Sequence, residues 1–193
     1  MSLTPSTMLE LGTRAPDFSL PDACSGQTIS LNDFTGKDAL LVIFMCAHCP
    51  FVKLVENEFA AIGRDYVDRG LGMVAISTND AENYPDDTPG KLAEQAERLG
   101  FIFPYCHDES QKTAKAYRAA CTPDLFLFDD DFKLVYRGQL DDSRPGNNLP
   151  VTGTDLRTAI DALLAKKPIT KDQHPAVGCN IKWKPGNDPD YFG

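Results

Sequence analysis

The chain has 193 residues, 42% of them hydrophobic, which is enough for one domain with a sizeable core. Its 28 Asp and Glu residues outnumber 19 Lys and Arg residues, so the formal net charge is −9. This charge argues against a nucleic acid or an anionic membrane as partner, because phosphate groups are bound by basic surfaces.

The N-terminal segment and the cysteine content predict a cytoplasmic protein. Residues 1–16 show no basic leader followed by an apolar run. The longest apolar stretch, Ala39–Met45, has the length of a strand and not of a membrane span. Six cysteines in a chain of this length are too few for a disulfide scaffold. We therefore expect them to be catalytic, metal-binding or inert.

The first half of the chain predicts a hairpin followed by a strand, a helix and a strand. Residues 17–20 and 28–31 alternate polar and apolar side chains around a Ser25-Gly26 turn signal, which is typical of a short hairpin. Residues 39–45 are apolar throughout and predict a central strand buried on both faces. From Pro50 to Gly70 the apolar residues recur at helical spacing, and residues 71–77 are again apolar. This order implies parallel strands joined by a right-handed crossover.

The second half predicts further alternation of helices and extended segments. A polar loop over residues 84–89 leads to a helix that opens at Pro89 and ends at Gly100. Residues 101–105 read as a short extended piece. Asp108 and Gln111 resemble a capping box for a helix through Tyr117.

The C-terminal part predicts a hairpin, a helix and an irregular tail. Residues 125–128 and 133–137 flank an acidic turn, as two strands of a hairpin do. An apolar stripe at helical spacing is formed by Leu156, Ala159, Ile160, Leu163 and Leu164, and Pro168 ends the predicted helix. Residues 174–193 carry Pro and Gly without a period, and we interpret them as a wrapping or partly disordered segment.

The tetrapeptide Cys46-Ala47-His48-Cys49 lies where the predicted central strand passes into a helix. Unpaired amides and the positive end of the dipole in the first helical turn stabilise a thiolate. We predict that Cys46 is the exposed nucleophile and that Cys49, one turn deeper, is the resolving thiol. A protonated His48 would stabilise the thiolate further and make the disulfide more oxidising.

Three segments carry a resemblance to a known family. They are Gly12–Leu20, the strand that ends in Cys46–Pro50, and Thr122-Pro123 before residues 124–128. Together they resemble the redoxin branch of the thioredoxin-like proteins, which includes peroxiredoxins of the alkyl hydroperoxide reductase (AhpC/TSA) type and TlpA-type thiol-disulfide reductases. The resemblance implies an α/β thioredoxin-like fold, with a central mixed β-sheet flanked by helices, an N-terminal β-hairpin and a C-terminal extension. We expect an N-terminal tail over residues 1–11, the redoxin domain over 12–167 and the extension over 168–193.

The same resemblance implies the site residues and the partners. Pro123 is expected to be cis and to face the two cysteines, and Thr122 to offer backbone hydrogen bonds to a bound polypeptide. The implied activity is thiol-disulfide oxidoreduction without a cofactor. The implied partners are protein or small-molecule disulfides, or peroxides, together with an unidentified electron donor.

Two departures from the peroxiredoxin pattern favour dithiol exchange over peroxide reduction. Aligned on Cys49, Val42 and Cys46 stand where that motif has Pro and Thr. Thr122-Pro123 also occupies the region of the expected active-site arginine. Because Cys49 aligns with the peroxidatic cysteine, a thiol peroxidase that uses Cys49 remains the alternative.

The remaining cysteines leave further readings open. Zinc would need a second ligand pair, and no other cysteines or histidines stand at ligand spacing, so we expect no metal site. A copper-binding module is the second metal alternative. Cys121 is either a third redox thiol beside Thr122 or a small buried core residue. Cys179 would act as a resolving thiol if the tail folded back over the site.

Overall fold

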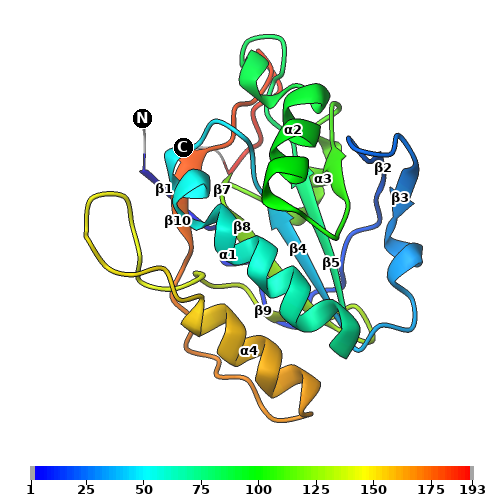
Figure 1. The fold of residues 1–193 in the computed structure, drawn as a ribbon, viewed down its shortest axis with the longest axis vertical. Helices are drawn as coiled ribbons and strands as arrows, with labels where there is room; N and C mark the ends of the chain where they lie inside the picture. The colour runs from blue at the N-terminus through cyan, green and yellow to red at the C-terminus, as the bar shows by residue number, and fades with distance from the viewer. Residues whose placement is uncertain (1–2, 192–193) are drawn as a thin grey trace.

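A five-stranded mixed sheet lies at the centre of the computed structural model, which describes residues 3–191 (Figure 1). Both the predicted N-terminal tail and the C-terminal extension reach beyond these residues. The strand order is β6-β5-β4-β8-β9, with β4 parallel to β5 and antiparallel to β8. The strands are β4 (Ala39–Phe44), β5 (Leu71–Ser77), β6 (Tyr105–His107), β8 (Asp124–Asp129) and β9 (Leu134–Tyr136). The predicted central mixed sheet is confirmed.

The apolar run of β4 is buried on both faces because each face has its own core. Leu41 and Ile43 pack toward α1 (Pro50–Tyr66), α2 (Pro89–Leu99) and α4 (Thr154–Leu164), and α1 crosses in front of the sheet in Figure 1. Val42 and Phe44 point to the opposite face. That face is covered by α3 (Lys112–Tyr117) and by the hairpin of β2 (Ser19–Pro21) and β3 (Thr28–Ser30). The hairpin was predicted, and β2 and β3 pair antiparallel.

Helix α1 presents one apolar stripe to the core. The buried residues of this stripe are Val52, Val55, Phe59, Ile62 and Tyr66, whereas Leu54 is 37% exposed. Pro50 takes the first helical position, where a missing N–H costs nothing. The helix ends at Tyr66, and a 3-10 turn (η2, Val67–Arg69) leads to Gly70. Gly70 has a φ of 99°, which favours glycine.

Two predictions about residues 101–111 were wrong. The extended piece begins at Tyr105, because Tyr105–His107 are the residues in register with Ala75–Ser77 of β5. The cap of α3 is Gln111, not Asp108. The Gln111 side chain donates hydrogen bonds to the carbonyls of Thr78 and Lys182 instead of forming a capping box. Long-range contacts, and not the local sequence pattern, therefore determine the structure of residues 101–111.

The two ends of the chain form a second sheet with a strand of the main domain. The strand order is β1-β10-β7, and both pairings are antiparallel. The strands are β1 (Leu3–Pro5), β7 (Cys121–Thr122) and β10 (Val177–Asn180). The C-terminal segment, which lacks a period in the sequence, thus wraps over the domain as the middle strand of this sheet (Figure 1).

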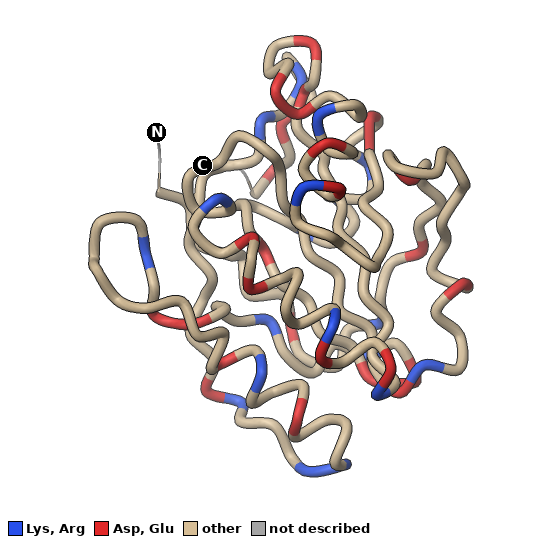
Figure 2. The backbone as a smooth tube through the Cα atoms, in the orientation of Figure 1, with Lys and Arg blue, Asp and Glu red and all other residues tan. Residues whose placement is uncertain are grey.

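Charged residues lie mainly on the outer helices and loops, with basic and acidic positions interspersed (Figure 2). The central strands are mostly uncharged, as their burial requires. Within residues 3–191, no helix combines the length and the apolar character needed to cross a membrane.

Candidate functional site

The two cysteines of the tetrapeptide lie between β4 and α1, but not where the sequence placed them relative to the helix. Cys49 is the N-cap residue of α1, and Cys46 lies in the connection that precedes it. The positive end of the helix dipole therefore acts most directly on Cys49. Cys46 and Cys49 are 1% and 0% exposed. The prediction that Cys46 is exposed is wrong, because the loop folds under neighbouring segments.

The peptide bond between Thr122 and Pro123 is cis, as the resemblance implied. Thr122 faces both cysteines: its Oγ1 lies 3.6 Å from Sγ of Cys46, and its carbonyl oxygen lies 3.3 Å from Sγ of Cys49. Strand β7 thus lies against both thiols.

The pKa values of the two thiols are shifted in opposite directions. The hydrogen bond between Cys49 and Cys46, with further hydrogen bonds to Cys179 and to the Thr122 side chain, holds the pKa of the Cys49 thiol well below its usual range despite burial. The same hydrogen bond to Cys49 raises the pKa of Cys46, as do burial and the negative charge of Asp87. Of the two thiols, Cys49 is therefore the one that loses its proton more readily.

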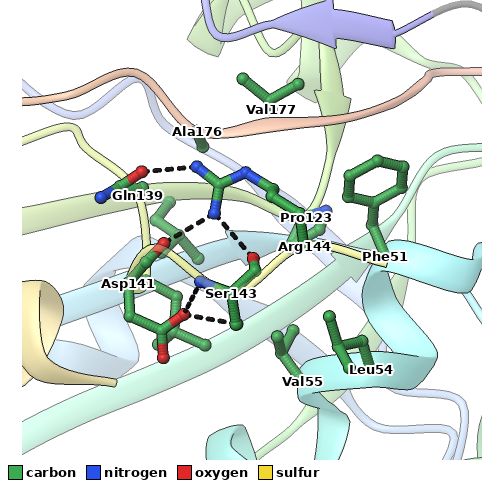
Figure 3. Close-up of a pocket in the computed structure, with 12 residues that line it drawn as sticks. Phe51, Leu54, Val55, Pro123, Gln139, Asp141, Ser143, Arg144, Ala176 and Val177 are labelled. Atoms are coloured by element: carbon green, nitrogen blue, oxygen red, sulfur yellow. Dashed lines mark hydrogen bonds between the residues drawn. The ribbon is translucent and has the colours of Figure 1, made fainter. Parts of the chain in front are cut away.

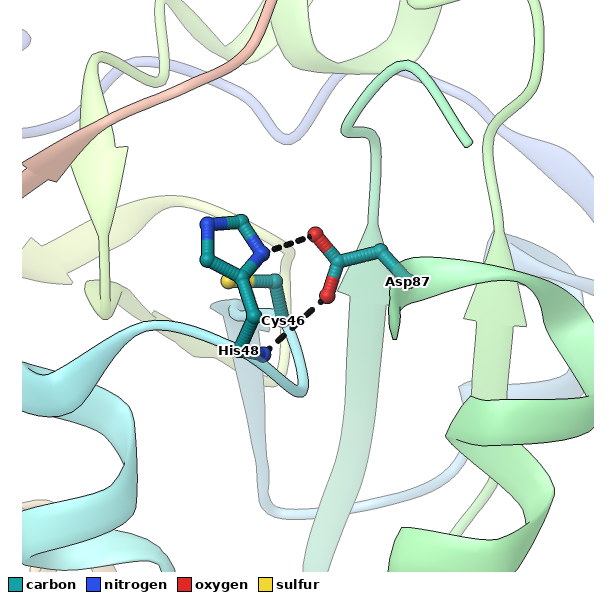
Figure 4. A group of neighbouring side chains, drawn as sticks. All are labelled: Cys46, His48 and Asp87. Carbon is teal, nitrogen blue, oxygen red and sulfur yellow. Dashed lines mark hydrogen bonds and ion pairs between the residues drawn. The ribbon is translucent and has the colours of Figure 1, made fainter. Parts of the chain in front are cut away.

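A buried carboxylate holds the loop that carries the cysteines (Figure 4). Oδ1 of Asp87 accepts the backbone N–H groups of Ala47 (2.8 Å) and His48 (3.2 Å). Oδ2 of Asp87 lies 2.5 Å from Nδ1 of His48 and accepts a hydrogen bond from Nδ2 of Asn79 at 2.8 Å. Burial works against the charge of Asp87, but the hydrogen bonds from His48, Asn79 and Ala47 outweigh it and lower its pKa.

His48 is oriented by this carboxylate toward the molecular surface. The hydrogen bond to Asp87 raises the pKa of His48 and outweighs partial burial. The ring stacks on Tyr84 at a centroid distance of 5.6 Å and an interplanar angle of 13°. When His48 is protonated, its positive charge is paired with Asp87, so the dyad as a whole adds little net charge beside Cys46. The expected direct stabilisation of a Cys46 thiolate by His48 is thereby reduced.

Asp87 is the site residue that the sequence reading missed. It ends a short 3-10 turn (η3, Pro85–Asp87) within the segment interpreted as a polar loop. No spacing connects it to the tetrapeptide, since the contact joins residues 39 and 40 positions apart. Its full burial is visible only in the fold.

Three side chains of the site, a thiol, an imidazole and a carboxylate, are of the kinds that bind metal ions. One ligand atom each from Cys46, His48 and Asp87 lies within 4.8 Å of the other two. A structural zinc site needs four ligands, and both oxygens of Asp87 already accept N–H groups. The arrangement is therefore better described as a hydrogen-bonded clamp around a thiol pair.

The structure brings one of the two additional cysteines to the thiol pair. Cys179 of β10 is 2% exposed, and its Sγ lies 2.8 Å from Sγ of Cys49. Cys121 makes its contacts to the carbonyls of Pro123 (3.6 Å) and Ala176 (4.0 Å). Burial raises the pKa of the Cys121 thiol well above its usual range. Its surroundings are those of a core residue.

A pocket lies beyond Pro123, between the start of α1 and the segment that leads into β10 (Figure 3). Phe51 and Leu54 form its apolar wall together with Pro123. On the opposite wall, the guanidinium of Arg144 donates hydrogen bonds to the carbonyls of Asp141 and Ser143, each at 2.7 Å. This hollow borders the cis-proline.

Comparisons with known proteins agree with this geometry. The model of the AhpC/TSA family matches residues 11–137. A protein of Mycobacterium tuberculosis named "Putative peroxiredoxin Rv2521" is 31% identical over 145 residues, which cover 69% of this chain and 87% of that protein.

Solved structures extend the likeness to almost the whole chain. The crystal structure of an uncharacterized conserved protein from Geobacillus kaustophilus is 50% identical, covers 96% of this chain and 98% of its own, and has a TM-score of 0.94. The thioredoxin domain of a thiol-disulfide oxidoreductase from Bacteroides vulgatus is 23% identical, covers 67% of this chain and 88% of its own, and has a TM-score of 0.56. The predicted thioredoxin-like fold is confirmed.

Proposed function

Since the chain belongs to the AhpC/TSA family of thioredoxin-like proteins, we propose that it is a thiol-disulfide oxidoreductase in which Cys46 and Cys49 alternate between dithiol and disulfide. The observation that carries this proposal is the hydrogen-bonded thiol pair at the start of α1, facing the cis Thr122-Pro123 peptide. A second sulfur so close to the first makes any mixed disulfide short-lived, because it is attacked within the same molecule.

We assign the first attack to Cys46. The sulfur of Cys49 is covered by the Thr122 carbonyl and by Cys179, whereas Cys46 adjoins His48, whose side chain is 23% exposed. The Cys49 thiolate takes the Cys46 proton through their hydrogen bond, and the Cys46 thiolate attacks one sulfur of a substrate disulfide. The other substrate sulfur leaves as a thiolate.

Cys49 then completes the exchange. Its proton passes to the departed thiolate, and its sulfur attacks Cys46 and releases the second substrate sulfur. The substrate gains two electrons, the protein gains the Cys46–Cys49 disulfide, and an electron donor restores the dithiol. Disulfides of proteins or of small molecules both fit this chemistry.

Serine variants test this assignment. Cys46→Ser is expected to lose turnover of a peptide disulfide, and Cys49→Ser to retain the peptide covalently on Cys46. Cys121→Ser is the matched control, since it removes a buried thiol outside the pair, and it is expected to turn over normally. Normal turnover by Cys46→Ser, together with no trapped peptide on Cys49→Ser, would overturn the mechanism.

A thiol peroxidase that uses Cys49 is the second candidate. Its support is the position of Cys49 at the helix N-terminus and its lowered pKa, which are properties of a peroxide-reactive thiol. In that reaction peroxide oxidises the Cys49 thiolate to a sulfenic acid, and a second thiol condenses with it to a disulfide and water. Val42 and Cys46 stand where the peroxiredoxin motif has Pro and Thr, and this departure makes the peroxidase the weaker candidate.

A further inference from the structure

Strand β10 occupies the edge at which a polypeptide is expected to pair with Thr122. Cys179 stands opposite Thr122 in the antiparallel register, and Asn180 stands opposite Cys121. The chain therefore places its own C-terminal strand where the resemblance puts a bound substrate. A polypeptide that pairs with Thr122 has to displace β10 first.

The approach of β10 to β7 depends on the glycine before Cys179. A Cβ atom at Gly178 would lie 2.0 Å from the carbonyl oxygen of Thr122 and 3.3 Å from the backbone nitrogen of Pro123. Any side chain at this position would push the strand away from the cis-proline. Gly178 thus lets the next residue, Cys179, bring its sulfur to 2.8 Å from that of Cys49.

We propose that β10 is a built-in substrate strand and that Cys179 exchanges with the Cys46–Cys49 disulfide to form a Cys49–Cys179 disulfide. This proposal rests on the proposed function, which supplies the Cys46–Cys49 bond. The Cys179 sulfur attacks Cys49, the Cys46–Cys49 bond breaks, and Cys46 leaves as a thiolate that takes up the proton released by Cys179. No electrons enter or leave, so the step is an isomerisation that needs no further oxidant.

The charge state of the site limits this step to the oxidised protein. In the reduced protein, burial and the hydrogen bond with Cys49 raise the pKa of Cys179 to about 12, so Cys179 is a thiol that lies against Cys49. Once Cys49 is part of a disulfide, its negative charge is gone and its sulfur becomes an electrophile. Cys179 is then the thiol already in contact with it.

The exchange has a consequence for the reaction. It regenerates the Cys46 thiol while the oxidising equivalent is stored in the disulfide to β10. The protein then has two oxidised forms with the same electron count, one with the disulfide inside the tetrapeptide and one with the disulfide to the C-terminal strand.

Disulfide mapping of the wild-type protein separates these two forms. Protein oxidised with glutathione disulfide is alkylated in acid and digested with trypsin. Cys46 and Cys49 share the peptide 38–53, whereas Cys179 lies in 172–182. We expect a cross-link between these two peptides, with alkylated Cys46 in the cross-linked product. Oxidised protein that contains only the disulfide within 38–53, with Cys179 alkylated throughout, overturns the proposal.

Two variants test whether β10 and the Cys179 thiol are responsible for the cross-link. Gly178→Ala is expected to lower the cross-linked fraction by about tenfold or more, because the methyl group displaces β10, while the disulfide within 38–53 still forms. Cys179→Ser removes the cross-link, and Cys121→Ser leaves it unchanged. An undiminished cross-link in Gly178→Ala contradicts the role of β10. Absence of both disulfides in the oxidised wild type would instead count against the proposed function itself.

Discussion

The carboxylate of Asp87 lies 2.5 Å from the imidazole of His48 and binds the loop between the two cysteines through backbone N–H groups as well. One buried side chain thus sets the charge of the histidine and the position of the thiols. We expect Asp87→Asn to lower the pKa of His48 toward its ordinary value, because a neutral amide replaces the carboxylate whose hydrogen bond raises that pKa. Titration of the His48 ring by NMR measures this shift.

Asp86→Asn is the matched control for this prediction. Asp86 is the neighbouring acid, but it is exposed, whereas Asp87 is fully buried. The control is expected to leave the His48 titration in place. An unchanged His48 pKa in Asp87→Asn would show that the dyad does not determine the histidine's charge.

The same dyad predicts how stability depends on pH. His48 has a raised pKa in the folded state. Its contribution to the free energy of unfolding is therefore fully present below its unfolded pKa of about 6.5 and is lost as the pH rises through its folded-state pKa. Asp87 has a lowered pKa in the folded state. Its contribution to the free energy of unfolding is therefore fully present above its unfolded pKa of about 3.9 and is lost as the pH falls through its folded-state pKa. The free energy of unfolding that Asp87→Asn loses should therefore be largest near pH 5 and smaller at pH 8. Denaturant unfolding at both pH values tests this, and a loss that increases toward pH 8 would contradict it.

A buried ion pair supports the turn that leads into the cis-proline. Arg137 donates to Oδ2 of Asp124 at 3.3 Å, and the same oxygen accepts the backbone N–H of Ala120 at 3.0 Å. Both side chains are almost completely buried. Asp124→Ala would leave the guanidinium without its counter-charge, so we expect a loss of about 3–5 kcal/mol in the free energy of unfolding.

A surface pair provides the comparison. Arg69 and Asp161 lie 3.1 Å apart with both side chains 54% exposed. Asp161→Ala is expected to change stability by less than about 1 kcal/mol, because solvent screens exposed pairs. Equal effects of the two substitutions in urea unfolding would rule out the structural role assigned to Asp124.

The contact between Gly178 and Thr122 also makes a prediction about stability. Gly178→Ala forces a methyl group against the Thr122 carbonyl and should cost about 1–3 kcal/mol. Gly90→Ala is the control, because Gly90 lies in α2 and a Cβ there meets nothing within 4 Å. Alanine at Gly90 should be neutral or stabilise the helix by about 0.5–1 kcal/mol. Thermal unfolding of both variants distinguishes the close contact from a general cost of replacing glycine.

Local patterns in the sequence were sufficient to predict the central helices and strands. The apolar run of β4, the helical period after Pro50 and the turn signal between β2 and β3 each depend on neighbours in the chain. The resemblance supplied the cis Thr122-Pro123 peptide. Elements with a strong local period were therefore predictable without knowledge of the fold.

Features that depend on long-range pairing were not predictable in this way. The segment of β10 has no hydrophobic period, and its strand exists because it lies between β1 and β7. Asp87 lies in a polar turn, and nothing in its surroundings indicates that its carboxylate binds the amides of residues 47 and 48. The burial of Cys46 has the same origin, since its cover comes from segments distant in sequence, including Thr122.

The most direct test of the central claim compares two oxidants of the fully reduced protein. The rate of thiol loss is measured with hydrogen peroxide and with a disulfide substrate, and the oxidised cysteines are mapped by mass spectrometry. We predict fast exchange with the disulfide through a bond between Cys46 and Cys49, and peroxide reactivity no greater than that of free cysteine. Fast peroxide consumption with a sulfenic acid at Cys49, and slow disulfide exchange, would contradict the account and identify a peroxidase.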